Sequence, residues 1–114
     1  MDISNEQIRY VELSLEEAKK VVAFGEAIKR LESNKDFKTV IGEGYFTNEA
    51  RRCVMLTAEI NLSADAKEAN WAAIRGIAEL RQFLMMRKQM GEVAQKEVAD
   101  HKETLEELRE EDAE

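Results

Sequence analysis

Residues 41–50 read IGEGYFTNEA and place two glycines around a carboxylate, directly ahead of a stretch with helix-forming character. A glycine-rich loop that leads into a helix can bind phosphate through its backbone N–H groups, as in nucleotide-binding enzymes. The Rossmann pattern needs a third glycine and a preceding strand, and the Walker loop ends in Gly-Lys-Ser/Thr. Both are missing here, and Glu43 would repel a phosphate. We therefore interpret Gly42 and Gly44 as a turn before a helix.

Nucleophilic and metal-dependent chemistry also lack the residues they usually need. Cys53 is the only cysteine and His101 the only histidine. The pattern places Cys53 on the apolar face of a helix, where a cysteine is typically structural. A di-iron bundle needs two Glu-x-x-His motifs, and zinc sites need clusters of His and Cys. The sequence therefore predicts a protein that is not an enzyme and has no cofactor or metal.

The charge of the chain is concentrated at one end. Residues 1–94 hold 14 Lys and Arg against 15 Asp and Glu, whereas residues 95–114 hold 3 against 9. Nucleic acid is not expected as a partner, because its binders carry a basic surplus. A narrower alternative is that an oligomer forms a pocket for a small anionic ligand. The candidate side chains for that pocket are Arg51, Arg52, Arg81, Arg87 and Lys88.

The composition predicts a soluble helical protein. The chain lacks proline, and 36% of its residues are charged, compared with about 25% in an ordinary globular domain. A single cysteine fits a reducing compartment. Residues 1–10 lack the apolar core of a signal peptide, and no run approaches the roughly 18 apolar residues of a membrane span. We expect a location in the cytoplasm and no association with membranes.

Apolar residues spaced by three and four predict the first helix at about 15–33. Ser14 and Glu17 form a capping box that would begin it. The preceding residues 1–13 are expected to be an irregular N-terminal arm. The short β-branched stretch 37–41 has no second strand to pair with, so we interpret it as a helical turn or an extended linker.

Two further helices follow the glycine-containing segment. The second is predicted at about 48–61, with Thr47 or Asn48 as its cap. The third begins at a Ser63 cap and continues to about residue 110, with Gly91 as its only interruption. About 46 residues of helix would be roughly 69 Å long, well beyond the average globular helix. Whether this helix bends at Gly91 is left open.

The long helix carries an apolar seam from residue 73 to residue 108, with alternating spacings of four and three over about five heptads. Such spacing is typical of a coiled coil, in which polar residues such as Arg87 and His101 can fix register. Between 71 and 94 the helix is apolar most of the way round, as in a helix covered on several sides. The seam residues expected to mediate association are Ile77, Leu80, Leu84, Arg87, Val98, His101, Leu105 and Leu108.

These elements predict an all-α fold, a small helical bundle with one long C-terminal helix that forms a coiled-coil-like seam. Residues 14–94 would form the helical body, and residues 95–114 an acidic helical tail that continues the long helix. The apolar stripe of the tail is too thin to keep an isolated helix folded. The tail would therefore pair with copies of itself, bind a partner protein or fray.

Three segments resemble a group of small helical proteins encoded by tailed bacteriophages. They are DFKTVIGEGYFTNEARRCVML at 36–56, IRGIAELRQFL at 74–84 and ETLEELR at 103–109, with Gly91 between the last two. The resemblance spans about residues 13–110 and contains no active-site motif. It implies a phage product made in the bacterial cytoplasm and built into or around the virion.

Two hypotheses follow from the seam, the charge and the resemblance. The first is a non-enzymatic, self-associating phage protein with a structural or assembly role in the virion, similar to a scaffold or connector. The alternative is a small phage-encoded inhibitor of a host or defence system, which binds a host protein or sequesters an anionic nucleotide. The expected partners are further copies of the chain or a phage or host protein.

Overall fold

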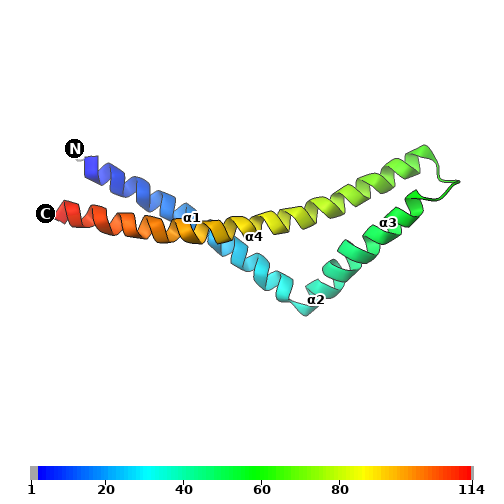
Figure 1. Cartoon of the computed structure of the whole chain (residues 1–114), viewed down its shortest axis with the longest axis horizontal. Coiled ribbons are helices and arrows are strands. Elements are labelled where there is room, and N and C mark those ends of the chain that lie inside the picture. Colours follow the sequence, from blue (N-terminus) through cyan, green and yellow to red (C-terminus); the bar gives the residue numbers. More distant parts are fainter. Residues whose placement is uncertain (1–2, 114) are drawn as a thin grey trace. The chain divides into compact units, whose positions relative to one another are not determined.

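The computed structural model describes residues 3–113, which are helical along nearly their whole length (Figure 1). The elements are α1 (Ile3–Ser33), α2 (Lys35–Phe37), η1 (Lys38–Glu49), α3 (Ala50–Thr57) and α4 (Ala64–Ala113). Element η1 is a π-helix and the others are α-helices. No strand occurs within 3–113. The prediction of an all-α fold with one long C-terminal helix is confirmed.

The first helix is much longer than the sequence predicted. Because α1 begins at Ile3, the expectation of an irregular arm is wrong for residues 3–13, and Met1 and Asp2 lie outside the described residues. Ser14 lies inside α1 and is half-buried, so it does not cap the helix. Packing against another helix stabilises a helical segment more than its own propensity does, and the partner of this segment is α4.

Two side chains mark where the chain changes direction. The Asn34 side chain accepts a hydrogen bond from the Phe37 backbone N–H at 3.0 Å, which caps α2. The Ser63 hydroxyl oxygen accepts one from the Ala66 backbone N–H at 3.2 Å, so the predicted cap of α4 is confirmed. From this cap, α4 continues without interruption through Gly91 to Ala113.

The glycine-containing segment is neither a phosphate loop nor a turn. Residues 38–49 form a π-helix of 12 residues, and no glycine in the described chain has a positive φ. π-Helical hydrogen bonds join residues five apart, and the Thr47 hydroxyl adds a bond of the same spacing to the Gly42 carbonyl at 3.2 Å. The caps predicted at Thr47 and Asn48 are therefore wrong, because both residues lie within this helix.

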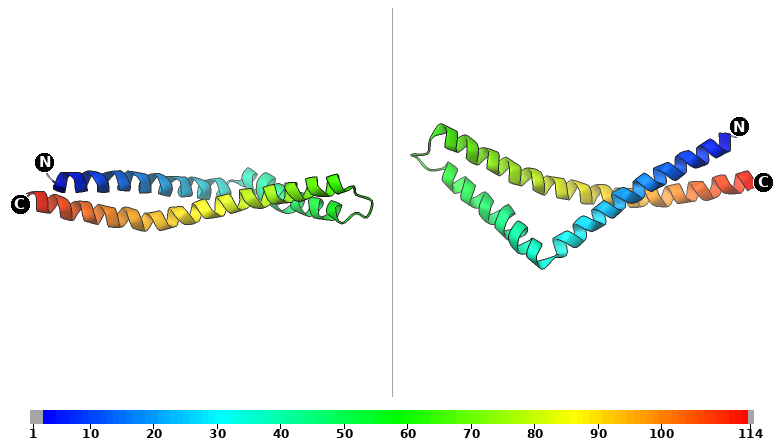
Figure 2. Two further views of the ribbon diagram at one scale, coloured as in Figure 1. Left: turned by 90° about the horizontal axis from the view of Figure 1, so that it is seen from above. Right: turned by 180° about the vertical axis from the view of Figure 1, so that it is seen from behind.

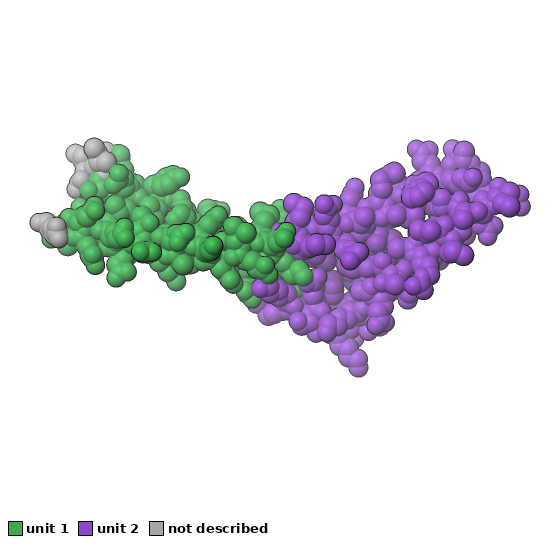
Figure 3. All heavy atoms as spheres, in the orientation of Figure 1, with its two compact units in different colours: residues 1–28, 87–114 green, residues 29–86 purple. Residues whose placement is uncertain are grey.

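The chain forms two compact units (Figure 3). Unit 1 combines residues 1–28 with residues 87–114, and unit 2 contains residues 29–86. This division differs from the expected arm, body and tail, because the acidic segment after residue 94 belongs with the start of the chain.

In unit 1, α1 and α4 run antiparallel, and the start of α1 lies beside the end of α4 (Figure 2). Its buried apolar side chains lie at helical spacing on both helices and are Leu15, Ala18, Ile28, Ala94 and Leu105. At the closest approach two glycines face each other. A Cβ atom added to Gly91 would lie 3.0 Å from the Gly25 Cα. The two backbones are therefore in direct contact, which any side chain at either position would prevent.

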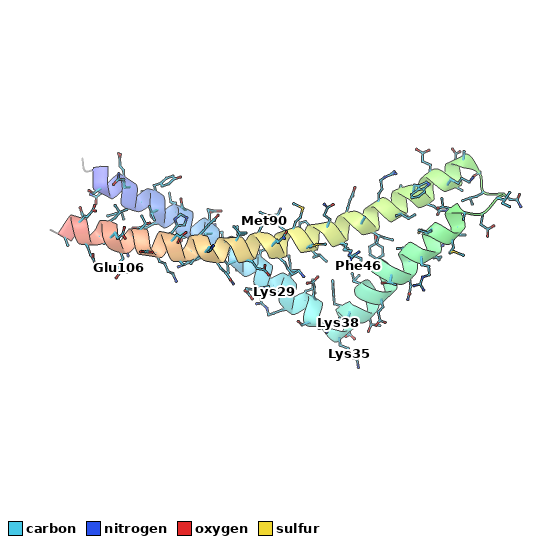
Figure 4. The ribbon with its side chains drawn as sticks, viewed as in Figure 1. Lys29, Lys35, Lys38, Phe46, Met90 and Glu106 are labelled. Carbon is cyan, nitrogen blue, oxygen red and sulfur yellow. The ribbon has the colours of Figure 1, made fainter. Side chains whose placement is uncertain are left out.

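Unit 2 has a smaller core, in which Cys53 of α3 and Ile77 and Leu84 of α4 are buried. The Phe46 side chain is half-buried and extends from η1 on the side that faces α4 (Figure 4). Beside it, η1 and α4 leave a groove of about 500 Å³. The groove exists partly because Gly76 has no side chain, and a Cβ atom added there would meet nothing within 4 Å.

We expect Cys53 to be unreactive in the folded protein, because its side chain is only 1% exposed. Thiol reagents attack the accessible thiolate. Titration with a coloured disulfide reagent should therefore show negligible reaction under native conditions and one equivalent after denaturation. Rapid reaction in the folded state would contradict the packing of α3 in unit 2.

Candidate interaction surface

The rear half of the predicted seam is covered within the chain. Leu105 is 5% exposed, and Val98, His101 and Leu108 are half-buried in unit 1. They lie on the face of α4 that contacts α1, where Ala94 and Gly91 also lie. This stripe therefore has a partner helix within the chain, which was not among the three expectations of self-pairing, a partner protein or fraying. The N-terminal residues that were expected to be irregular supply its partner helix.

The front half of the seam is only partly covered. Ile77 and Leu84 are buried in unit 2, whereas Leu80 is 38% exposed. Arg87 belongs to unit 1 and lies over the Phe24 ring of α1, with its guanidinium carbon 5.9 Å from the ring centre. A cation–π contact of this kind stabilises an exposed pair by about 0.5–1 kcal/mol. Arg87 thus has a contact within its own unit.

Sequence reasoning missed the matching seam on α1, although the signal was present. Buried and half-buried positions on α1 recur with alternating spacings of four and three, which is the heptad pattern already recognised on α4. The residues are Ser4, Ile8, Val11, Leu15, Ala18, Val22 and Gly25. The capping box at Ser14 obscured this pattern, since it favoured a helix that begins halfway along it.

The five cationic candidates for an anion pocket do not lie in one unit. Arg51 and Arg52 of α3 and Arg81 of α4 belong to unit 2, whereas Arg87 and Lys88 belong to unit 1. Arg52 is engaged by the Glu49 carboxylate through a close ion pair. The hydrogen bond that the Arg52 guanidinium donates to the Glu49 carboxylate is the main reason why the pKa of Glu49 is lowered and the pKa of Arg52 is raised. Arg52, one of the five candidates, is thus already paired with a carboxylate of its own chain.

No cluster of three or more His, Cys, Asp or Glu side chains suited to a metal ion occurs within the described residues. His101 lines a groove together with Glu97, one turn before it on α4. Cys53 lies 3.6 Å from a Glu49 carboxylate oxygen, in a different unit from His101. His101 and Cys53 therefore belong to different units of the described chain.

Exposed apolar side chains lie along α4 in unit 2, on both sides of the buried seam. Trp71 and Met85 follow one side at multiples of seven residues, and they are 50% and 51% exposed. Phe83 and Met86 lie on the other side and are 42% and 52% exposed. We call these two stripes the α4 flanks. They account for the apolar character all round the helix that the sequence showed between 71 and 94.

Comparison with known proteins gives no further indication of function, because no family model, curated protein or solved structure matches the chain. None of the helices between residues 3 and 113 has the length and apolar character that crossing a bilayer requires. The resemblance to phage proteins remains a prediction from the sequence.

Proposed function

We propose that the chain is a non-enzymatic structural or assembly protein that associates with further copies of itself through the α4 flanks of unit 2. The supporting observation is the large apolar surface that the chain leaves uncovered. Among the described residues, fifteen large hydrophobic side chains are exposed and eight hydrophobic residues are buried. Large exposed apolar patches mark protein–protein interaction sites.

The distribution of the apolar surface favours unit 2 as the part of the chain that associates. Ten of the fifteen exposed side chains belong to residues 29–86. A helix that is apolar most of the way round is normally covered on several sides, whereas α4 in unit 2 is buried only along Ile77 and Leu84. Full burial of a Phe or Met side chain contributes about 1.5–3 kcal/mol. The half-exposed flanks therefore retain a substantial part of that free energy for association.

The charge of each unit favours the same face. Unit 1 holds 16 Asp and Glu against 8 Lys and Arg, a net charge of −8. Unit 2 holds 8 against 9, a net charge of +1. Copies of unit 1 repel one another because they carry a large charge of one sign. Copies of unit 2 meet no such barrier, and their mixed charges can pair at the rim of an interface.

The proposed function is the first of the two hypotheses from the sequence, but the surface that mediates association is now the α4 flanks instead of the predicted seam. The predicted seam is largely used within the chain, so the flanks beside it take that role. The resemblance to small helical phage proteins supplies the context, in which the oligomer would be part of the virion or would help to assemble it. Detection of the chain in purified particles or procapsids by mass spectrometry would support that context.

We expect the purified protein to form a defined oligomer that the double variant Trp71→Glu, Met85→Glu dissociates to a monomer. Two carboxylates placed on one flank would have to be desolvated in the interface. The measurement is native mass by light scattering after size exclusion. The matched control is Gln82→Glu, which adds a carboxylate to an exposed position on the same helix and should leave the native mass unchanged.

Circular dichroism should show the same helix content for all three proteins, because each substituted side chain is at least half-exposed or polar. A monomeric wild-type protein at micromolar concentration would overturn the proposal. An oligomer that survives the double substitution would show that another surface holds the copies together.

A further inference from the structure

Among the described residues, hollows lie on both sides of the α1–α4 pair of unit 1, and the charges along the two sides differ. One groove is about 930 Å³ in volume, and acidic and basic side chains occur in equal numbers along it. Its basic side chains are Arg9, Lys19, Lys102 and Arg109, and its acidic ones are Glu12, Glu16, Glu106 and Glu110. The Arg109 guanidinium lies 3.5 Å from a Glu12 carboxylate oxygen, so charges within this groove already pair.

The other side of the pair has two adjoining hollows of about 440 and 430 Å³, and Tyr10 lines both of them. We call this side the Tyr10 groove. Its apolar lining includes Val11 and Leu108 in one hollow and Ala18 and Val21 in the other. Tyr10 itself is 72% exposed. An exposed tyrosine beside an apolar groove offers a rigid amphipathic contact surface, which is typical of protein interfaces.

The charged side chains that line the Tyr10 groove are all acidic, and the groove is also lined by His101. Glu6 lines the first hollow and Glu17 and Glu97 line the second, and neither hollow is lined by Lys or Arg. Lys20 contacts Glu17 at 3.1 Å, but both side chains are 73% exposed. Such an exposed pair contributes little and exchanges readily for another cation.

We propose that the Tyr10 groove binds an amphipathic helix of another protein, with an apolar stripe toward the groove and Lys or Arg along its edges. A third helix laid into the groove of a helical pair presents apolar anchors every three or four residues. Cations beside that stripe would meet Glu6, Glu17 and Glu97. The groove follows α1 from residue 6 to residue 21, about 24 Å of helix, so it holds roughly four turns of the partner.

Other occupants fit less well. A second copy of unit 1 would bring another net charge of −8 to the groove. Nucleic acid and anionic lipid surfaces are repelled for the same reason. The proposal is independent of association through the α4 flanks, since the two surfaces lie in different units.

The test uses the full chain and two defined peptides of about 16 residues, long enough to span the groove. One peptide has leucines at heptad spacing and lysines elsewhere, and its counterpart replaces each lysine by glutamate. Titration calorimetry or fluorescence anisotropy should show saturable binding of one lysine peptide per chain. The glutamate peptide should not bind.

Matched charge reversals locate the binding. Glu17→Lys with Glu97→Lys reverses two charges in the Tyr10 groove, and Glu16→Lys with Glu106→Lys reverses two in the opposite groove. Glu106 is an exposed residue of α4 (Figure 4). Both variants change the net charge equally. We expect the first to weaken lysine-peptide binding by about tenfold or more and the second by less than about threefold. Unchanged helix content by circular dichroism confirms folding of both.

The single variant Tyr10→Glu adds a test of the apolar contact, and it should abolish peptide binding while leaving the native mass unchanged. Equal weakening by the two double variants would show that the peptide senses only the overall charge. Saturation by the glutamate peptide, or no binding at about 0.1 mM, would also overturn the proposal. A lower native mass for Tyr10→Glu would show that a second copy covers the groove instead.

Discussion

Replacing Gly91 with leucine is expected to destabilise unit 1 by about 3 kcal/mol or more. The neighbours of an added Cβ are backbone atoms, the Gly25 Cα at 3.0 Å and the Val21 carbonyl oxygen at 3.4 Å. Backbone atoms cannot move aside as the end of a side chain can, so α1 and α4 must separate. Urea unfolding followed by circular dichroism measures the loss as a lower midpoint.

Alanine substitutions at two glycines of α4 are expected to change the stability of the protein in opposite directions. Alanine is favoured over glycine in a helix by about 0.8–1 kcal/mol, so Gly76→Ala in α4 should stabilise the protein, since nothing lies within 4 Å of the added Cβ. Gly91→Ala, in the same helix, should destabilise it because the contact with Gly25 outweighs that gain. If both alanine variants raised the urea midpoint, the two helices would not be in backbone contact at Gly91.

Leu105→Ala is expected to increase local unfolding of the start of α1 and of the end of α4 together. Leu105 is 5% exposed, and removing a buried leucine side chain costs about 2–5 kcal/mol. Because α1 and α4 stabilise each other, local unfolding at this end must release both helices. Hydrogen exchange followed by mass spectrometry should show faster exchange at residues 3–15 and 98–113, with little change in unit 2.

The control for this prediction is Leu80→Ala, the same substitution at a 38% exposed position in unit 2. It should leave exchange at both ends of unit 1 as in the wild-type protein. If residues 98–113 already exchange at the rate of an unfolded chain in the wild type, the acidic segment frays as one sequence interpretation had it. In that case α1 would have no partner along its first four turns.

The features of the fold that could be predicted from the sequence depend on local interactions. The Ser63 cap and the long run of helix-forming residues after it involve neighbours in the chain, so α4 was predicted nearly to its observed ends. The start of α1 depends on a segment about 90 residues away, and a local cap pattern at Ser14 gave the wrong boundary. Only a comparison of the two heptad patterns could have shown that the seam on α4 had a partner in the same chain.

The structural roles of the glycines could not be predicted from the sequence. Gly42 and Gly44 matched the composition of a turn, yet both lie in a π-helix with ordinary right-handed backbone angles. Gly91 was interpreted as an interruption of the long helix, yet it lies within α4 in backbone contact with Gly25. The composition of a segment does not distinguish a glycine that permits a turn from one that permits contact, because the difference lies in what faces it.

The same principle explains what could be predicted of the candidate surface. Between 71 and 94 the sequence showed an apolar character on several sides of α4, and the structure leaves Trp71, Phe83 and Met85 substantially exposed. The sequence could not show which stripe is covered within the chain, because that depends on where α1 and η1 lie. The Tyr10 groove was missed for the same reason, since it is formed by residues from both ends of the chain.

The discontinuous composition of unit 1 has a consequence for the order in which the protein folds. Unit 2 is one continuous segment, whereas the halves of unit 1 are separated by residues 29–86. Closing a flexible loop of that length costs roughly 3.6 kcal/mol plus a constant, and a folded unit 2 removes much of this cost. During synthesis, the residues of α1 in unit 1 must therefore leave the ribosome unpaired and remain so until residues 87–113 are translated. Until then the apolar stripe of α1 is available to chaperones, or to the wrong helix of a neighbouring chain.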